Sequence, residues 1–290
     1  IKAVREGLAG NRITRIAGIL NGTCNYILTQ MQAEGREFAE VLGDAQRLGY
    51  AEADPSFDID GIDAAHKLAI LAALAFGRPV AFDAVHVEGI RGVSALDIGF
   101  ARELGYRIKL LGIARASEAG IEARVHPCMV PESAPLARVD GVYNAVVAEG
   151  DFVGRLMLEG RGAGAGPTAS AVVADLVDLA RGRMTPVWGA AAGDLSNAPS
   201  VPISAHVGCY YLRLMVVDRP GVIADVTAVL RDQGVSLESM LQRGRALGEA
   251  VPVVLVTHET AESATAAAVQ RIAGLDAVLE APVVVRIETG

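Results

Sequence analysis

The 290-residue sequence has little cysteine, and its three cysteines lie far apart, at positions 24, 128 and 209. None forms a C-x-x-C pair, so the sequence offers neither a disulfide framework nor a zinc-binding pattern. His126 lies near Cys128, but Pro127 separates them and no second ligand pair follows, so we predict no metal site. Sparse, odd-numbered cysteine is typical of a reducing compartment, and we expect a cytoplasmic protein.

The sequence also lacks long apolar runs and an excess of basic residues. No apolar run reaches the ~18 residues needed to span a bilayer, and the longest, Leu68–Phe76, ends at a Gly-Arg-Pro turn. The net charge is −8, whereas nucleic acids and anionic membranes select basic surfaces, so both are excluded as main partners. The first residues show no cleavable signal pattern, and Ile1 leads us to expect that the true start precedes it.

What the sequence does have is an acidic stretch between Gly49 and Leu71, GYAEADPSFDIDGIDAAHKLAIL. Asp63 and Lys67 are four residues apart, so they share one helix face and can form an ion pair. Carboxylates of this kind can bind a substrate ammonium while the lysine transfers a proton. Composition alone favours a simpler interpretation, an acidic loop that leads into a solvated helix. The carboxylates are Glu52, Asp54, Asp58, Asp60 and Asp63.

The helix expected over 62–76 weakens the interpretation as an acidic loop that leads into a solvated helix. It is apolar on most of its circumference, so most of it is buried. A lysine in such a helix is costly to desolvate unless it is paired or lies at a cleft. The alternative, a surface lysine beside Asp63, stays open.

Hydrophobic patterns predict an α/β (α+β) fold with a mixed, largely antiparallel sheet that is covered by helices. We expect helices at 1–10, 23–34 (with Thr23 as its cap), 38–48, 62–76 and 94–104. We expect strands at 12–20, 85–90, 107–116, 121–130, 142–149 and 152–159.

A glycine-rich turn, GRGAGAGP, follows the last of these strands and opens a helix. Gly160, Gly162 and Ala165 nominally satisfy the dinucleotide motif G-x-G-x-x-A. The segment 176–188 does not supply the second strand of a βαβ unit, so the motif does not predict a complete dinucleotide site. Its backbone amides can still contact a phosphate or ribose that another domain brings. The alternative is a tight turn of small residues.

Residues 189–207 are rich in Ala, Ser and Pro and have little periodicity, which is typical of a linker. The remainder reads strand, helix, strand, strand, helix, strand, the ferredoxin-like βαββαβ order. The expected strands are 210–217, 235–242, 252–258 and 277–287, and the helices are 220–233 and 261–272. Pro220 is expected near the first helical position.

Four motifs in one order resemble those of homoserine dehydrogenases: GILNGTCNYIL, LGYAEADP, DIDGIDAAHK and GAGAG. The segments YYLRLMVVDRPGVIADVTAVL and GVSLESMLQ resemble an ACT domain, an amino-acid-sensing module. The resemblance implies a catalytic and dimerisation domain at 1–188, a linker at 189–207 and an ACT regulatory domain at 208–290.

The resemblance also implies residue roles. Lys67 and Asp63 match catalytic residues, and Gly49 and Gly166 match positions near a nicotinamide cofactor, NADP or NAD. The implied substrate-binding residues are Thr23, Glu52, Asp58 and Asp63. The implied effector-binding residues are Asp218, Pro220, Gly221, Val222, Ile223, Ser239 and Met240.

The implied reaction interconverts L-homoserine and L-aspartate 4-semialdehyde in threonine, methionine and isoleucine biosynthesis. Lys67 or a bound water would handle the proton of the substrate oxygen. Threonine is the expected effector, and the alternative is an ACT unit that dimerises without a ligand. We expect a homodimer or homotetramer, because the sheet and the ACT-like unit both offer apolar faces.

This sequence departs from the family pattern in lacking the N-terminal Rossmann domain, which also carries a second catalytic lysine. We therefore expect a truncated enzyme that is inactive, or nearly so, alone. Two other hypotheses are a non-catalytic amino-acid-binding and oligomerisation protein, and another amino-acid dehydrogenase that shares this back half.

Overall fold

The computed structural model describes residues 1–189, 191–243 and 248–289. They form two compact units, each built from several segments of the chain. The first comprises residues 1–98, 108–127 and 135–201, and the second comprises 99–107, 128–134 and 202–290. No helix in the described ranges is long and apolar enough to cross a membrane.

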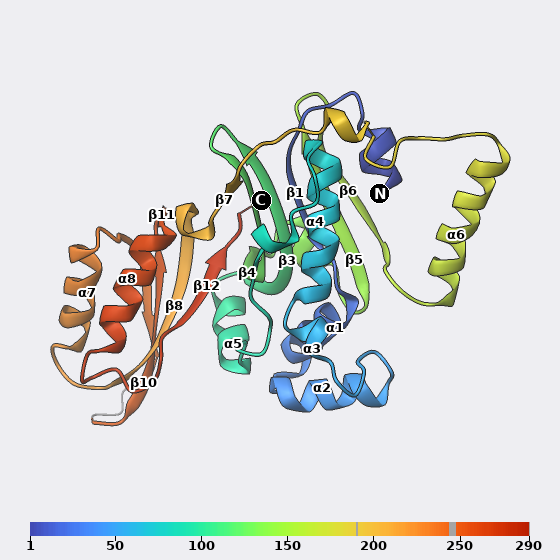
Figure 1. Cartoon of the computed structure of the whole chain (residues 1–290). Helices are drawn as coiled ribbons and strands as arrows, with labels where there is room; N and C mark the ends of the chain where they lie inside the picture. The colour runs from blue at the N-terminus through green and yellow to red at the C-terminus, as the bar shows by residue number, and fades with distance from the viewer. Residues whose placement is uncertain (190, 244–247, 290) are drawn as a thin grey trace. The chain divides into compact units, whose positions relative to one another are not determined.

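The first unit is organised on a sheet with the strand order β6-β5-β1-β3-β4 (Figure 1). Strands β3 and β5 flank β1 and run antiparallel to it, and β6 is antiparallel to β5, whereas two short strands, β2 and β7, join β4 in parallel. The predicted mixed, largely antiparallel sheet is therefore confirmed. The strands are β1 (Ile13–Ile19), β2 (His86–Val87), β3 (Tyr106–Ser117), β4 (Gly120–Pro131), β5 (Tyr143–Gly150), β6 (Gly154–Arg161) and β7 (Ser200–Val201).

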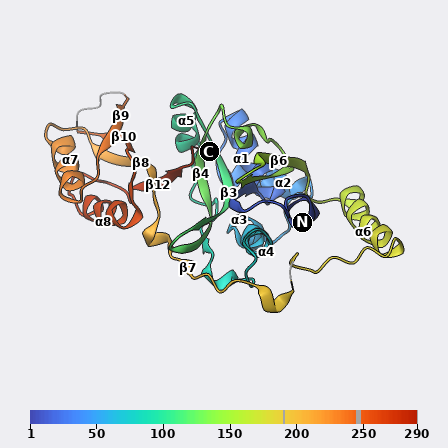
Figure 2. The same cartoon turned by 90° about the horizontal axis from the view of Figure 1, so that it is seen from above.

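Helix α4 (Ile62–Phe76) covers this sheet and is the helix that carries Lys67 (Figures 1 and 2). Its buried face includes Leu68, which is 0% exposed. A Cβ added at Gly112 of β3 would lie 3.5 Å from Leu68, so helix and sheet are in close contact there. The other helices are α1 (Gly22–Glu34), α2 (Phe38–Arg47), α3 (Ser56–Ile59), α5 (Ala95–Glu103) and α6 (Ala165–Ala180), with a π-helical turn at Ala3–Gly7 and 3-10 turns at Phe82–Ala84, Pro135–Arg138 and Ala192–Asp194.

Three local predictions in this unit are wrong. The helix expected at 1–10 is only a π-helical turn over Ala3–Gly7. The cap of α1 is Asn21, whose side chain accepts a hydrogen bond from the Cys24 backbone N–H, and not Thr23. The strand expected at 85–90 is only His86–Val87. The chain leaves β4 after Glu88, because the next residues turn to contact α3 and the Ile90 N–H bonds the Ile59 carbonyl.

The second unit has the predicted βαββαβ order. Its strand order is β12-β8-β10-β9, and helices α7 and α8 lie on one face of that sheet (Figures 1 and 2). Tyr210, Leu212, Leu214 and Val216 alternate along β8 and form the core that these helices cover. The elements are β8 (Val207–Val217), α7 (Val222–Asp232), β9 (Leu237–Gln242), β10 (Ala250–Thr257), β11 (Thr260–Ala261), α8 (Glu262–Ala273) and β12 (Val283–Ile287), preceded by a 3-10 turn at Ile203–Ala205.

The largest differences from the predicted bounds in this region concern α7, β8 and the last strand. Helix α7 begins at Val222 after a left-handed Gly221, so Pro220 lies before the helix. The last strand begins at Val283 instead of residue 277. Strand β8 begins at Val207, inside the segment that was expected to be a linker.

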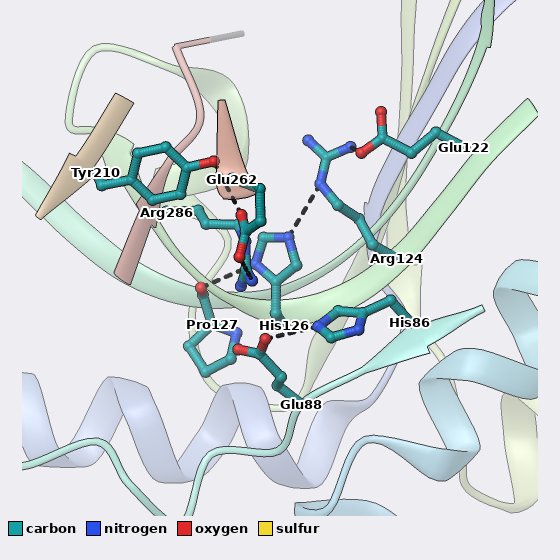
Figure 3. A network of polar contacts seen from close by, with 9 residues as sticks. All are labelled: His86, Glu88, Glu122, Arg124, His126, Pro127, Tyr210, Glu262 and Arg286. Atoms are coloured by element: carbon teal, nitrogen blue, oxygen red, sulfur yellow. Dashed lines mark hydrogen bonds and ion pairs between the residues drawn. The ribbon is translucent and has the colours of Figure 1, made fainter. Parts of the chain in front are cut away.

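A buried ion pair fixes the start of α8 in the second unit (Figure 3). Glu262 accepts hydrogen bonds from Arg286 Nε at 2.8 Å and Nη2 at 2.5 Å, and from the Tyr210 hydroxyl at 2.9 Å. Arg286 is 6% exposed, so its charge requires this partner. The contact ties β12 to the first turn of α8.

Candidate active site

A cavity of about 480 Å³ lies in the first unit where the β1–α1 junction, the acidic stretch, α4 and the glycine-rich turn after β6 meet. Its walls are mainly polar and backbone groups, which suits a small charged ligand. The lining residues are Asn21, Gly22, Thr23, Gly49, Tyr50, Asp58, Asp63, Lys67, Val142, Asn144, Arg161, Gly162, Ala163 and Gly164.

Lys67 and Asp63 form the predicted ion pair. Lys67 Nζ lies 2.7 Å from Asp63 Oδ2 and 3.2 Å from the Leu20 carbonyl oxygen. The side chains are 46% and 20% exposed. Lys67 is therefore a surface lysine beside Asp63, which was the alternative to a buried lysine. Both side chains also line the cavity. Left-handed Gly61 starts α4 and places Asp63 in its first turn, where a carboxylate is favoured.

Asp58 and Asp63 are joined by a residue that was not predicted. Asn21 Nδ2 donates to Asp58 Oδ1 at 2.8 Å and to Asp63 Oδ2 at 2.9 Å. The signal was present in the sequence, because an asparagine directly before an apolar helix is a preferred cap. Nothing in the sequence places that cap against residues about forty positions further on.

Thr23 and Gly49 also line the cavity. The Thr23 hydroxyl donates to the Tyr50 carbonyl oxygen at 2.8 Å, and the Tyr26 and Tyr50 rings lie 4.8 Å apart. Gly49 has a φ of 76°, a left-handed conformation that favours glycine. These contacts hold the start of the acidic stretch against α1.

Two predicted site residues are not among the lining residues. Glu52 has an exposed side chain, and its carbonyl oxygen accepts from Gln46 Nε2 at 3.0 Å. Gly166 lies in the exposed first turn of α6, while Gly162 and Gly164 reach the cavity instead. Asp54 and Asp60, for which no site role was expected, bind the Ser56 N–H and Arg91.

The wall formed by β5 and β6 adds a cation and an amide. Arg161 lies over the Tyr143 ring, with Cζ 5.4 Å from the ring centroid. Asn144 Oδ1 is buried and has no hydrogen-bond partner within the described ranges. A Cβ at Gly162 would collide with the Asn144 amide, so a residue without a side chain is required there. A ligand that enters here meets an acceptor, a guanidinium and open backbone.

Cys24 lies under the carboxylates and is 0% exposed. Its Sγ donates to the Asp58 carbonyl oxygen at 3.2 Å. Burial, and then the charges of Asp58 and Asp63, raise the pKa of this thiol above its ordinary value. It is therefore a neutral packing group and not a nucleophile.

The predicted effector residues lie in the second unit. Asp218, Pro220 and Gly221 lie in the turn between β8 and α7, where Gly221 is left-handed, and Val222, which is 3% exposed, and Ile223 begin α7. Ser239 and Met240 lie on β9, at the end of the strand order, and Met240 is 49% exposed. Strand β10 separates β9 from β8, so the two groups of residues are two strands apart in the sheet.

Within the described residues, no group of three or more His, Cys, Asp or Glu side chains could hold a metal ion. His126, which the sequence placed near Cys128, uses both ring nitrogens (Figure 3). Its Nε2 accepts from Arg124 Nε at 3.0 Å, so the ring proton is on Nδ1, 3.0 Å from the Pro127 carbonyl oxygen. A ring in these two contacts is held as a neutral structural group.

The fold and cavity define a class: an α+β unit with a cavity lined by two carboxylates and a lysine, followed by a ferredoxin-like module. Comparison with known proteins agrees. A family profile described as homoserine dehydrogenase matches residues 1–177, and an ACT domain profile matches residues 210–276. The chain belongs to the homoserine dehydrogenase family and carries an ACT domain.

Individual relatives match almost the whole chain. A homoserine dehydrogenase of Pseudomonas aeruginosa is 47% identical, over 99% of this chain and 68% of its own length. One from Synechocystis is 48% identical with the same coverage. The crystal structure of a homoserine dehydrogenase from Thiobacillus denitrificans superposes with a TM-score of 0.93 at 50% identity, covering 99% of this chain and 67% of that one. A hyperthermophilic archaeal homoserine dehydrogenase in complex with NADPH has a TM-score of 0.53 at 32% identity, covering 62% and 51%.

Proposed function

We propose that the cavity is the substrate site of an enzyme that interconverts L-homoserine and L-aspartate 4-semialdehyde in amino-acid biosynthesis. The observation that carries the proposal is the arrangement of Asp58, Asp63 and Lys67 around one cavity in a chain of this family. A zwitterionic substrate needs anionic partners for its ammonium, and the two carboxylates supply them. The predicted role of Glu52 at the substrate remains part of the proposal.

Lys67 is the proposed proton-transfer group. Its Nζ uses one contact for Asp63 and one for the Leu20 carbonyl, and a third N–H bond remains to reach a ligand oxygen. In the direction of reduction, Nζ donates a proton to the oxygen formed at C4 and stabilises its developing charge. In the direction of oxidation, Lys67 or a bound water accepts that proton.

NADP or NAD is the proposed cofactor, and when bound it supplies the hydride. The glycine-rich wall fits a flat, polar ring: Gly162 leaves the backbone bare, and Asn144 Oδ1 offers an unused acceptor for an N–H group. Gly49 and the turn before α6 would hold it. Binding of NADPH by an archaeal relative supports this choice.

Two measurements test the proposal. Calorimetry should show that L-homoserine binds and that 4-hydroxybutanoate, which lacks the ammonium, binds much more weakly. The full-length protein should oxidise NADPH with L-aspartate 4-semialdehyde at 340 nm. Equal affinity for the two ligands would remove the proposed role of the carboxylates. We expect the 290-residue chain alone to turn over slowly or not at all, and ready turnover by it would contradict that expectation.

We also propose that residues 208–290 form a regulatory domain that binds an amino acid, with threonine the first choice, joined through 189–207 to a domain at 1–188. The ACT profile, the glycine at the start of α7 and the open edge of β9 support an effector between two copies in a homodimer or homotetramer. A cytoplasmic location is in keeping with three free cysteines.

The effector proposal has its own test. Millimolar threonine should release or absorb heat in calorimetry and raise the Tm, and Asp218→Ala should abolish both effects. Absence of both effects in the unmodified protein would count against threonine and favour an ACT unit that only dimerises. Light scattering with and without threonine would show the oligomeric state.

A further inference from the structure

We propose that Asn21 is a positioning residue for the reaction: its amide holds Asp58 and Asp63 at a fixed separation and in register with Lys67. The inference rests on the proposed function. Asn21 is 5% exposed and lies between β1 and α1, where its side-chain amide is close to the carboxylates of Asp58 and Asp63. Its Nδ2 is 2.8 Å from Asp58 Oδ1 and 2.9 Å from Asp63 Oδ2.

The orientation of the amide follows from its surroundings. Asn21 Oδ1 accepts from the Cys24 backbone N–H at 2.8 Å. An exchanged amide would place an oxygen against two carboxylates and an NH₂ against an N–H donor, which removes three hydrogen bonds at once. Both N–H bonds of Asn21 are therefore committed, one to each carboxylate.

The choice of a neutral donor has a chemical reason. Two carboxylates that share one donor repel each other, and an arginine or lysine in place of Asn21 would neutralise them. Such a cation would compete with the substrate ammonium for the same oxygens. An amide gives each carboxylate a charge-assisted hydrogen bond and leaves its negative charge available.

The segment Leu20–Asn21 also positions Lys67. Asp63 Oδ2 accepts from both Asn21 and Lys67, and Lys67 donates in addition to the carbonyl of Leu20, the residue before Asn21. Leu20 and Asn21 thus contact the three charged side chains from one junction, where the Asn21 cap holds the start of α1. Loss of the amide should misplace the carboxylates and the lysine together.

The test is Asn21→Ser, which keeps a helix cap but cannot donate to both carboxylates. In the full-length protein, we expect kcat/KM for L-homoserine to fall roughly 10- to 100-fold, the loss that charge-assisted hydrogen bonds give. The larger part should be in KM, and the preference for L-homoserine over 4-hydroxybutanoate should shrink by a similar factor. Asn21→Asp keeps the cap acceptor and adds a third carboxylate, and should lose L-homoserine turnover more completely.

Asn25→Ser is the matched control, because Asn25 is a buried asparagine of the same helix whose Nδ2 donates to the carbonyls of Val139 and Tyr143 instead of carboxylates. It should lower the Tm and leave the substrate preference unchanged. If Asn21→Ser behaves in the same way, Asn21 is only a cap and the inference is overturned.

Failure of the variants to fold would leave one decisive measurement on the unmodified protein. The ¹⁵N–¹H signals of the Asn21 side-chain amide should shift when L-homoserine saturates the site, and unchanged signals would overturn the inference. A wild type that does not bind L-homoserine would instead count against the proposed function.

Discussion

At the scale of single residues, the sequence analysis named Asp58, Asp63 and Lys67, which line the cavity, and missed Asn21, the neutral residue that joins the two carboxylates. Asp63 and Lys67 share a helix face by their spacing alone, and the structure places them 2.7 Å apart. Asn21 was beyond reach because its role depends on a hydrogen bond to Asp58, 37 residues away in the sequence. Spacing within one helix is local information, whereas the meeting of two segments depends on the packing of α4 against the sheet.

Replacement of Lys67 by methionine removes the proton donor and retains the aliphatic stem. We expect kcat of the full-length protein to fall by roughly 10²- to 10⁴-fold, the usual contribution of a positioned general acid or base. The Tm should hardly change, because an exposed ion pair of this kind adds little stability. Lys2→Met is the control, since Lys2 pairs with Asp178 outside the cavity. Steady-state kinetics measure kcat for both variants. An unchanged kcat for Lys67→Met would mean that a water molecule, and not Lys67, transfers the proton.

Cys24 gives a prediction for stability against pH. Burial and the nearby carboxylates raise the pKa of its thiol in the folded state, so the stabilisation is complete below the ordinary thiol pKa of 9.0. As the pH rises above 9, the thiol ionises in the unfolded chain and stays neutral in the folded one, so stability falls. The free energy of unfolding of the wild type should fall with pH more steeply than that of Cys24→Ala, by up to about 1.4 kcal/mol per pH unit. Denaturant titrations between pH 7 and 10 measure both slopes, and parallel slopes would show that Cys24 does not contribute.

At the scale of elements, the chain's turn away from β4 holds the acidic stretch in place. A Cβ at Gly89 would collide with the Ile59 carbonyl oxygen and lie 2.5 Å from Asp60 Cα. We expect Gly89→Ala to lower the free energy of unfolding by roughly 1 to 3 kcal/mol through overpacking, and to weaken L-homoserine binding because Asp58 is adjacent. Gly92→Ala is the control, since nothing lies within 4 Å of its Cβ position. Equal denaturation midpoints for the two variants would refute the close packing.

The same region shows why element bounds were less predictable than element types. Long periodic segments such as α4 were found with their predicted ends, 62 and 76. The strand expected over 85–90 stops at Val87, because Gly89 and Ile90 contact α3, a four-residue helix with too few positions to show a period. The cap of α1 was misassigned by two residues, since both Asn21 and Thr23 are cap formers.

At the scale of the whole molecule, the sequence suggested two domains joined by a linker, and the units in the structure are less simply divided. Residues 128–134 follow most of β4 in the chain, yet they belong to the second unit. There Cys128 and Met129 pair in parallel with Arg286 and Ile287 of the last strand. Parallel pairing between segments more than 150 residues apart leaves no local trace in a sequence, so a linear division could not find it.

This pairing predicts that the last strand is essential to the second unit. Deletion of residues 283–290 removes β12 from between β8 and β4 and uncovers Cys128 and Met129, both of which are 0% exposed. It also leaves Glu262 without its arginine partner. Val285 and Ile287 alone bury enough apolar surface for roughly 3 to 6 kcal/mol, so we expect a large fall in Tm and binding of a hydrophobic dye. Deletion of residues 289–290 alone is the control and should change neither. If the variant that lacks residues 283–290 unfolds with an unchanged Tm, the ACT unit folds independently of its final strand and the prediction is wrong.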